Sequence, residues 1–415
     1  RGVHIDYGKL YIDTAGRLII RDAVWKSSLS NADTTVRAAR SRCGIAWWSW
    51  GRRQPFLHSI ELQGGRVETR LDDSTAATLR DLRCTASLGV DEFILESMSA
   101  RILNVSIEGS GRIPWDAFRR TRAPGIPSKP LDLSGLAPAW RRAEEISAEI
   151  RAARPPKLTA TFKGSDDIGQ FFAEVRILFP PLTYRGISVR EARGSATFQS
   201  DVARIPRLEI HLDPGASITL ACRADLQQKQ GSAVIEVSGD PSWALPLLPE
   251  SAQKTASSLR FDAPPSTRCE VRASWDGTPS ATALLDADWR NLEFAGRRIN
   301  RIQIPAAFEG GKIFVPEATL ITGDESVVVR FLRDAPSGEA RGSVTGTLDP
   351  AIVGPLLPPA AQPFFSSCQF SEGVTMDIRA TLPSGDPRGL RLDGSIDIKN
   401  AHYKGRSEEH TSELQ

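Results

Sequence analysis

Residues 182–186 read LTYRG, and the same pattern returns as LEFAG at residues 292–296 and as AHYKG at residues 401–405. Each copy has an apolar residue, a polar residue, an aromatic residue, any residue and then glycine. The two intervals between the copies agree to within one residue. This spacing indicates an internal repeat of about 110 residues, and the repeat decides which fold we expect.

Residues outside the motif repeat at nearly the same spacing. Phe198 returns as Phe308, and the dipeptide Asp-Pro at residues 240–241 returns at residues 349–350. Matches spread over this length, with a single slipped residue, favour a true repeat over chance similarity of three short segments.

Apolar and polar residues alternate along many segments of the repeats. Val175, Ile177 and Phe179 fall on one side of an extended chain, and Glu174 and Arg176 fall on the other. Such alternation predicts strands with one buried and one solvated face. Since each repeat offers one short helical segment as cover, we expect an all-β fold. The expected architecture is a long curved antiparallel β-groove of ~110-residue repeats with short helical crossovers.

The composition shifts along the chain predict its organisation. A helix is expected at residues 138–154, because Pro155 and Pro156 stop it. Residues 56–71 are expected to form a hairpin around Gly64-Gly65. The expected parts are an N-terminal β region at 1–110, a Pro/Gly-rich connection and helix at 111–156, β-groove repeats at 157–265 and 266–374, and the start of a third repeat at 375–405.

Two segments have distinct expected origins or roles. Residues 45–50, IAWWSW, predict a short turn or helix that plugs the end of a sheet, with an interfacial belt on a bilayer as the alternative. Residues 406–415, RSEEHTSELQ, look like the translation of a sequencing-library adapter, and we expect them to be an artefact. We therefore expect the chain to be a piece of a longer protein.

The residues that carry chemistry in enzymes form no recognisable constellation here. The sequence has no GxSxG, P-loop, GxGxxG or HExxH motif. Its five cysteines are dispersed, which argues against a disulfide framework and against zinc, although one bridge stays open. A net charge of +2 gives no sign of nucleic-acid binding. We expect no catalytic residues, no metal, no cofactor and no enzyme activity.

The apolar side of the strands is then the candidate functional surface. It is either an ordinary hydrophobic core or a groove that shields acyl chains, and the repeat favours the groove because a uniform apolar lining suits a sliding lipid tail. A one-residue register slip would move all of its members to the other face. The expected lining consists of Val175, Ile177, Phe179, Ile210, Leu212, Ile218, Leu220, Val327, Val329 and Phe331.

Two parts of the chain carry a resemblance to a known family. The run GRLIIRDAVWKSS…PFLHSIELQGGRVETRL at residues 16–71 and the repeating meander at residues 157–405 are similar to the AsmA-like (TamB/YhdP) family of bacterial envelope proteins. The resemblance implies a periplasmic protein anchored in the inner membrane by an N-terminal helix, which we expect to lie outside this chain. It also implies a repeating β-groove that conducts phospholipids toward the outer membrane, and no catalytic residues.

The sequence thus predicts a non-enzymatic envelope protein that binds and conducts phospholipid acyl chains along an apolar β-groove, with a possible outer-membrane protein as partner. Two alternatives remain open. One is a scaffold for outer-membrane protein assembly that pairs its edge strands with clients. The other is a structural stalk whose core is filled by its own side chains.

Overall fold

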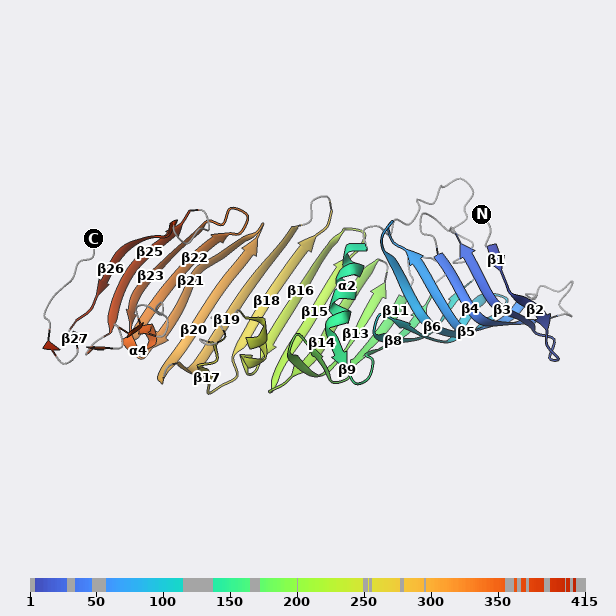
Figure 1. The fold of residues 1–415 in the computed structure, drawn as a ribbon, viewed down its shortest axis with the longest axis horizontal. Helices are drawn as coiled ribbons and strands as arrows, with labels where there is room; N and C mark the ends of the chain where they lie inside the picture. The colour runs from blue at the N-terminus through green and yellow to red at the C-terminus, as the bar shows by residue number, and fades with distance from the viewer. Residues whose placement is uncertain are drawn as a thin grey trace. The chain divides into compact units, whose positions relative to one another are not determined.

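The structure, a computed structural model, confirms the all-β prediction. Among the residues that the structure describes, 25 strands belong to one sheet by their hydrogen-bonded ladders, and three short strands form a second sheet. The chain divides into two compact units, residues 1–208 and 209–415. Figure 1 shows their strands, coloured from blue at the N-terminus to red at the C-terminus. The structure describes residues 4–27, 34–46, 57–114, 137–164, 172–199, 201–248, 253, 256–276, 280–294, 296–354, 362–363, 367–370, 373–383, 389–399, 401–403 and 406–407.

The first unit begins with eight strands. Strands β1 and β2 both pair antiparallel with β3, each along a different part of it, and β3 to β8 then pair as successive antiparallel neighbours. They are β1 His4–Asp6, β2 Lys9–Ile12, β3 Leu18–Ser27, β4 Thr34–Ile45, β5 Leu57–Arg70, β6 Ala76–Leu88, β7 Glu92–Ile102 and β8 Val105–Pro114. The unit continues with α2 Ala137–Glu149, β9 Ile150–Ala152, β10 Lys157–Lys163, β11 Phe172–Phe179, β12 Leu182–Tyr184 and β13 Ile187–Gln199. Strand β14, Val202–Leu212, crosses the boundary between the two units.

The predicted hairpin around Gly64-Gly65 is wrong, because β5 runs through both glycines as one strand. Gly64 has a φ of +64° and lies where the pairing of β5 with β6 shifts register between Leu62 and Gly65. The two glycines therefore form a bulge, which adds a residue and bends the strand without reversing it. A Cβ on Gly65 would lie 2.9 Å from the Cβ of Leu82, so the close strand also requires glycine there.

The predicted helix at residues 138–154 is shorter in the structure. Helix α2 ends at Glu149, and residues 150–152 form β9, which pairs with β12. Strand pairing takes over these three residues, since the edge of β12 satisfies their backbone groups before the prolines at 155 and 156 are reached.

Among the described ladders, β8 and β10 form a parallel pair, and α2 lies between them in the chain. A parallel partner requires the chain to travel back along the length of a strand, and 13 helical residues cover about 20 Å. The helical segments of the later repeats instead connect antiparallel strands, β16 to β18 and β23 to β25. These later segments are inserts at one end of the strands.

The second unit repeats the same order of elements. Its strands are β15 Ala216–Asp225, β16 Gln230–Ser238, β17 Leu259–Phe261, β18 Ser266–Ser274, β19 Ser280–Phe294, β20 Arg297–Glu309, β21 Lys312–Thr322, β22 Glu325–Asp334, β23 Ala340–Leu348, β25 Val374–Leu382 and β26 Arg391–Asp397. The helical inserts are the 3-10 helix η4 Pro241–Leu247 and α4 Pro350–Val353. The second sheet contains β24 Cys368–Phe370, β27 Ala401–Tyr403 and β28 Arg406–Ser407.

The repeat seen in the sequence is present in the structure. Strands β13 and β14 have the same lengths as β20 and β21, and each starts one repeat before its counterpart. The three-residue strands β9, β17 and β24 likewise recur once per repeat. Each pairs antiparallel with one copy of the LTYRG pattern, namely β12, the end of β19, and β27. In every repeat, the motif therefore lies at the end of a hairpin and pairs with a short strand.

The glycine of the motif closes this hairpin. Tyr184 pairs with Ile187, so that Arg185 and Gly186 form a two-residue turn with φ values of +49° and +82°. Positive φ at both positions is the geometry of the hairpin turn that matches the twist of the strands, and glycine adopts it without strain. Arg185 also donates two hydrogen bonds to Glu149, the last residue of α2, which lowers the pKa of that carboxyl.

Several predicted features fall outside the described residues. In the IAWWSW segment, the structure describes residues 45 and 46 but not the three tryptophans. Residues 115–136, which make up most of the predicted connection, and residues 408–415 also lie outside the described part of the chain. Residues 406–407 pair with β27 as a short continuation of its hairpin.

Candidate functional site

In the first unit, the predicted lining residues stand in apolar rows that cross several strands. Directly paired residues in a sheet lie on the same face, so the ladder register shows which side chains are neighbours. One row runs Gly109, Ala160, Val175, Ala196 across β8, β10, β11 and β13, and the next runs Ile107, Leu158, Ile177, Gly194. Phe179 pairs with Ala192 on the same face.

The second unit has the same arrangement over more strands. Leu220 is followed across β16, β18, β19 and β20 by Ile235, Cys269, Leu285 and Ala306. The neighbouring row runs Ile218, Val237, Thr267, Ala287, Ile304. Further along the unit, Val329 is followed by Val344 and Ile378, and Phe331 by Gly342, Ala380 and Leu392. We call the side that carries these rows the apolar face of each unit.

The predicted residues differ in how deeply they are buried. Leu212 and Val327 are 2% and 4% exposed and belong to the core. Val175, Ile177, Phe179, Ile210, Ile218, Leu220, Val329 and Phe331 are half-buried. Most of the proposed lining is thus neither exposed like a surface nor sealed like a core.

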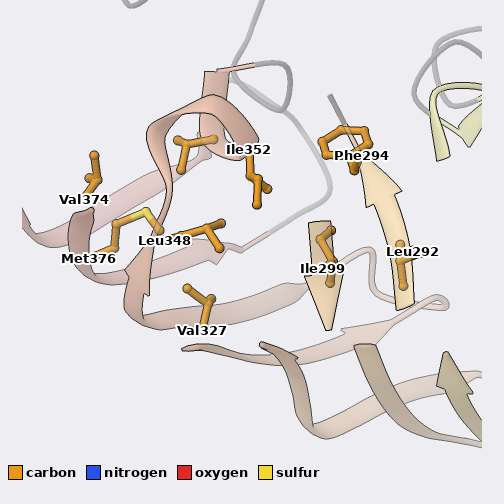
Figure 2. Packing of buried hydrophobic residues seen from close by; sticks show 9 residues of the cluster. Leu292, Phe294, Ile299, Val327, Leu348, Ile352, Val374 and Met376 are labelled. Atoms are coloured by element: carbon orange, nitrogen blue, oxygen red, sulfur yellow. The ribbon is translucent and has the colours of Figure 1, made fainter. Parts of the chain in front are cut away.

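The sealed part of the apolar face lies beneath α4. Val327 joins a cluster with Leu348, Val374 and Met376 from the sheet and Ile352 from α4, all at most 9% exposed. Figure 2 shows these sheet residues gathered below Ile352. Val329, Val344 and Ile378, one step along the strands, pack against the cluster while only half-buried.

The inserts are placed by the repeated Asp-Pro dipeptide. The carboxylate of Asp349 accepts a hydrogen bond from the backbone N–H of Ala351 at 2.8 Å, and Pro350 occupies the first turn of α4. Asp240 caps η4 in the same way, accepting from the N–H of Ser242 at 2.8 Å. Aspartate satisfies free helix N–H groups, and proline has none to lose, so the dipeptide starts each insert.

The other end of the apolar face is open. Phe308 pairs with Ala283 in the row beside Leu285, and it also pairs with Ile313. Phe308 and Ile313 are 40% and 37% exposed. Along β19 to β22, the apolar face therefore changes from a covered end beneath α4 to an uncovered end with exposed aromatic and aliphatic side chains.

The opposite side, which we call the polar face, is held by ion pairs across strands. Arg268 donates to Glu236 at 2.6 Å and to Glu270 at 3.0 Å. Asp288 accepts from Arg290 and from Arg301, each at 2.8 Å, and these hydrogen bonds lower its pKa to about 2. Charge of both signs alternates on this face, which keeps it solvated.

The cysteines contribute to the structure mainly through packing. Cys222 and Cys269 lie on the apolar face, and none of the five cysteines, all within described residues, is in a disulfide. Burial raises the pKa of the Cys43 and Cys84 thiols, so both are protonated at neutral pH. Within the described residues, no group of three or more His, Cys, Asp or Glu side chains could hold a metal ion.

Sequence reasoning identified part of the apolar face and missed the rest. Ile235, Val237, Leu285, Val344 and Ile378 were not predicted as lining, although their alternation with polar residues is as clear as that of Val327 and Val329. The glycines that complete the rows, Gly109, Gly194 and Gly342, have no apolar side chain to signal their place. Only the register assigns them.

The fold and this face together define the protein as an all-β repeat protein with an amphipathic, incompletely covered sheet. Comparison with protein-family models, with curated proteins and with solved structures finds no match. Over the residues that the structure describes, none of the helices has the length and apolar character needed to cross a membrane.

Proposed function

We propose that this protein binds phospholipid acyl chains on its apolar face and lets them move along the rows of side chains. The observation that carries the proposal is the register, which joins half-buried apolar residues into rows that cross up to five successive strands. A row without charged members offers a moving acyl chain similar surroundings at each strand. Neighbouring strands lie about 4.8 Å apart, which is less than the length of an acyl chain, so one acyl chain can contact several strands at once.

The energetics favour this occupant. Transfer of an acyl chain from water to an apolar surface gains about 0.8 kcal/mol per buried CH₂ group. The half-buried state of Leu220, Val329 and Phe331 leaves apolar area to be covered by a ligand. The cluster beneath α4 closes one end of this face, so tails would occupy the open end and headgroups would stay in water beside it.

The cellular setting belongs to the same proposal and rests on the resemblance to the AsmA-like family. It comprises a periplasmic location, an inner-membrane anchor supplied by a longer protein, and transfer of phospholipid toward the outer membrane with a protein partner there. The scaffold for outer-membrane protein assembly stays a prediction without a supporting contact.

A structural stalk with a filled core is the second candidate, and the cluster beneath α4 supports it. Leu292, Ile299, Ile352 and Val374 are at most 1% exposed, so this part of each strand is filled by the protein itself. The stalk hypothesis requires the half-buried residues to be equally necessary for folding, whereas the lipid hypothesis does not.

The test is lipid content. The chain is secreted to a bacterial periplasm, purified, and extracted for phospholipid analysis by mass spectrometry. Val329→Asp places a charge on the apolar face, and its neighbour Val328→Asp places the same charge on the polar face, where Val328 pairs with Thr345. Leu220→Asp is a second variant outside the cluster beneath α4. Circular dichroism and limited proteolysis establish which variants are folded.

We expect stoichiometric phospholipid in the wild type and in Val328→Asp, and its loss in folded Leu220→Asp or Val329→Asp. A folded wild-type protein that carries no phospholipid after secretion would contradict acyl-chain binding. Unfolding of both apolar-face variants, with Val328→Asp intact, would favour the filled stalk.

A further inference from the structure

The polar face of the second unit contains a hollow of about 480 Å³ that the acyl-chain proposal does not use. It lies over β15, β16, β18 and β19, near the strand ends remote from the helical insert η4. Its walls are polar, and the ladder register places its residues in two adjacent rows. One row is Arg223, Ser232, Arg272, Thr282, and the other is Asp225, Gln230, Ser274, Ser280.

The two arginines flank a small residue. Arg223 and Arg272 lie on either side of Ser232, two strand spacings or about 10 Å apart at their Cα atoms. Long, flexible arginine side chains can therefore meet above Ser232. The hydroxyls of Ser274, Ser280 and Thr282 add donors along the same wall.

The charge of this hollow is less balanced than elsewhere on the polar face. Arg272 has no hydrogen bond or ion pair with any residue that the structure describes, and Arg223 approaches Asp225 only to 3.9 Å. On the same strand as Arg272, Arg268 is bound by Glu236 and Glu270. The lining thus has two guanidinium groups and one carboxylate, that of Asp225 in an ion pair with Arg223, so it carries a net positive charge beside several hydroxyls.

The next copy of the repeat places its arginines at other positions. In the next copy of the repeat, Leu332 stands at the position of Arg223, and Thr381 stands at the position of Arg272. The corresponding row there runs Leu332, Arg341, Thr381, Arg391, so its two arginines flank Thr381 one strand further along. In that row Arg341 is paired with Glu339 at 2.6 Å, whereas Arg272 has no such partner among the described residues, so the hollow around Ser232 is the better candidate for an anion.

We propose that Arg223 and Arg272 bind a phosphate group in this hollow, as inorganic phosphate or as a phosphomonoester. Guanidinium groups match the oxygens of phosphate with paired hydrogen bonds, and serine and threonine hydroxyls supply the remaining donors. The volume suits a small phosphorylated molecule. The site lies on the side opposite the apolar rows and does not depend on acyl-chain binding.

The test is calorimetric titration of the full chain with inorganic phosphate and with glycerol 3-phosphate at low ionic strength. We expect saturable binding, and a loss of affinity of about tenfold or more in Arg272→Gln and in Arg223→Gln, because each removes charged hydrogen bonds. Arg268→Gln is the matched control on the same face, and it should bind as the wild type does. Both arginines of the hollow are exposed, so these variants should fold.

Vesicles distinguish the source of the phosphate. Flotation with phosphatidylcholine vesicles, with and without phosphatidic acid, shows whether the site takes a lipid headgroup. Binding that requires phosphatidic acid and Arg272 assigns the headgroup, and binding of the soluble phosphates alone assigns a soluble ligand. Absence of saturable phosphate binding, or an equal loss in Arg268→Gln, would overturn the proposal.

Discussion

Leu292→Ala is expected to destabilise the second unit far more than Leu284→Ala, although both leucines lie in β19. Leu292 is 0% exposed and packs in the cluster beneath α4, whereas Leu284 is 56% exposed on the polar face. The pair keeps residue type, strand and chemical change constant. Burial alone differs, so the comparison measures whether the cluster is a packed core.

The expected magnitudes come from the carbon atoms removed. Leucine to alanine deletes three carbons, which at about 0.8 kcal/mol each gives roughly 2.4 kcal/mol for a fully buried side chain. The cavity left among Phe294, Ile299 and its other neighbours raises the cost to about 3 kcal/mol. For Leu284, with more than half of its side chain in water, about 1 kcal/mol or less is expected.

Amide hydrogen exchange of β19 and β20 is the suitable assay. Repeat proteins can open locally, so a single unfolding midpoint would average over parts that do not contain the mutation. Leu292→Ala should lower the opening free energy of the β19–β20 ladder, in which Leu292 pairs with Ile299, by about 3 kcal/mol. Equal effects of the two variants, or an effect of Leu292→Ala below about 0.5 kcal/mol, would refute the packed cluster.

Two further predictions concern glycine and pH. Gly111→Ala should destabilise the β8–β10 pair, because the added Cβ would lie 2.3 Å from the carbonyl oxygen of Phe162. Gly109→Ala should be tolerated, because the atom nearest to its added Cβ, at 3.2 Å, is the end of the flexible Met98 side chain. Thermal unfolding of both variants checks this, and equal midpoints would contradict it. Asp288→Asn should cost stability at neutral pH, and its difference from the wild type should shrink as pH falls from about 4 to about 2. Because the pKa of Asp288 is lowered in the folded state, its stabilisation is present above pH 3.8 and is lost as the folded carboxyl becomes protonated. Denaturant titrations measure the difference in unfolding free energy between the variant and the wild type, and a difference that stays constant with pH would count against the ion pairs of Asp288.

The short motif predicted the repeat but not the local geometry of its own residues. The sequence located the repeat from the glycine and aromatic residue of LTYRG, but it predicted one strand over residues 182–189, where the structure has a turn at Arg185 and Gly186. The end of α2 could not be located from the sequence, because residues 150–152 satisfy their backbone groups with β12, which lies well beyond them in the chain. Gly64-Gly65 shows the same limit, since a glycine pair fits a bulge as well as a hairpin.

By itself, the amino-acid sequence determined the all-β class, the existence of the internal repeat and which side chains of a strand share a face. These properties depend on alternation and turn residues within one segment, and they need no knowledge of partners. The tertiary structure alone decided the register that joins Leu220 to Ile235 and Cys269, the parallel pairing of β8 with β10, and the covering of Val327 by α4. It also placed Arg223 and Arg272 around one hollow. Each of these depends on contacts between residues distant in the chain, which no local pattern encodes.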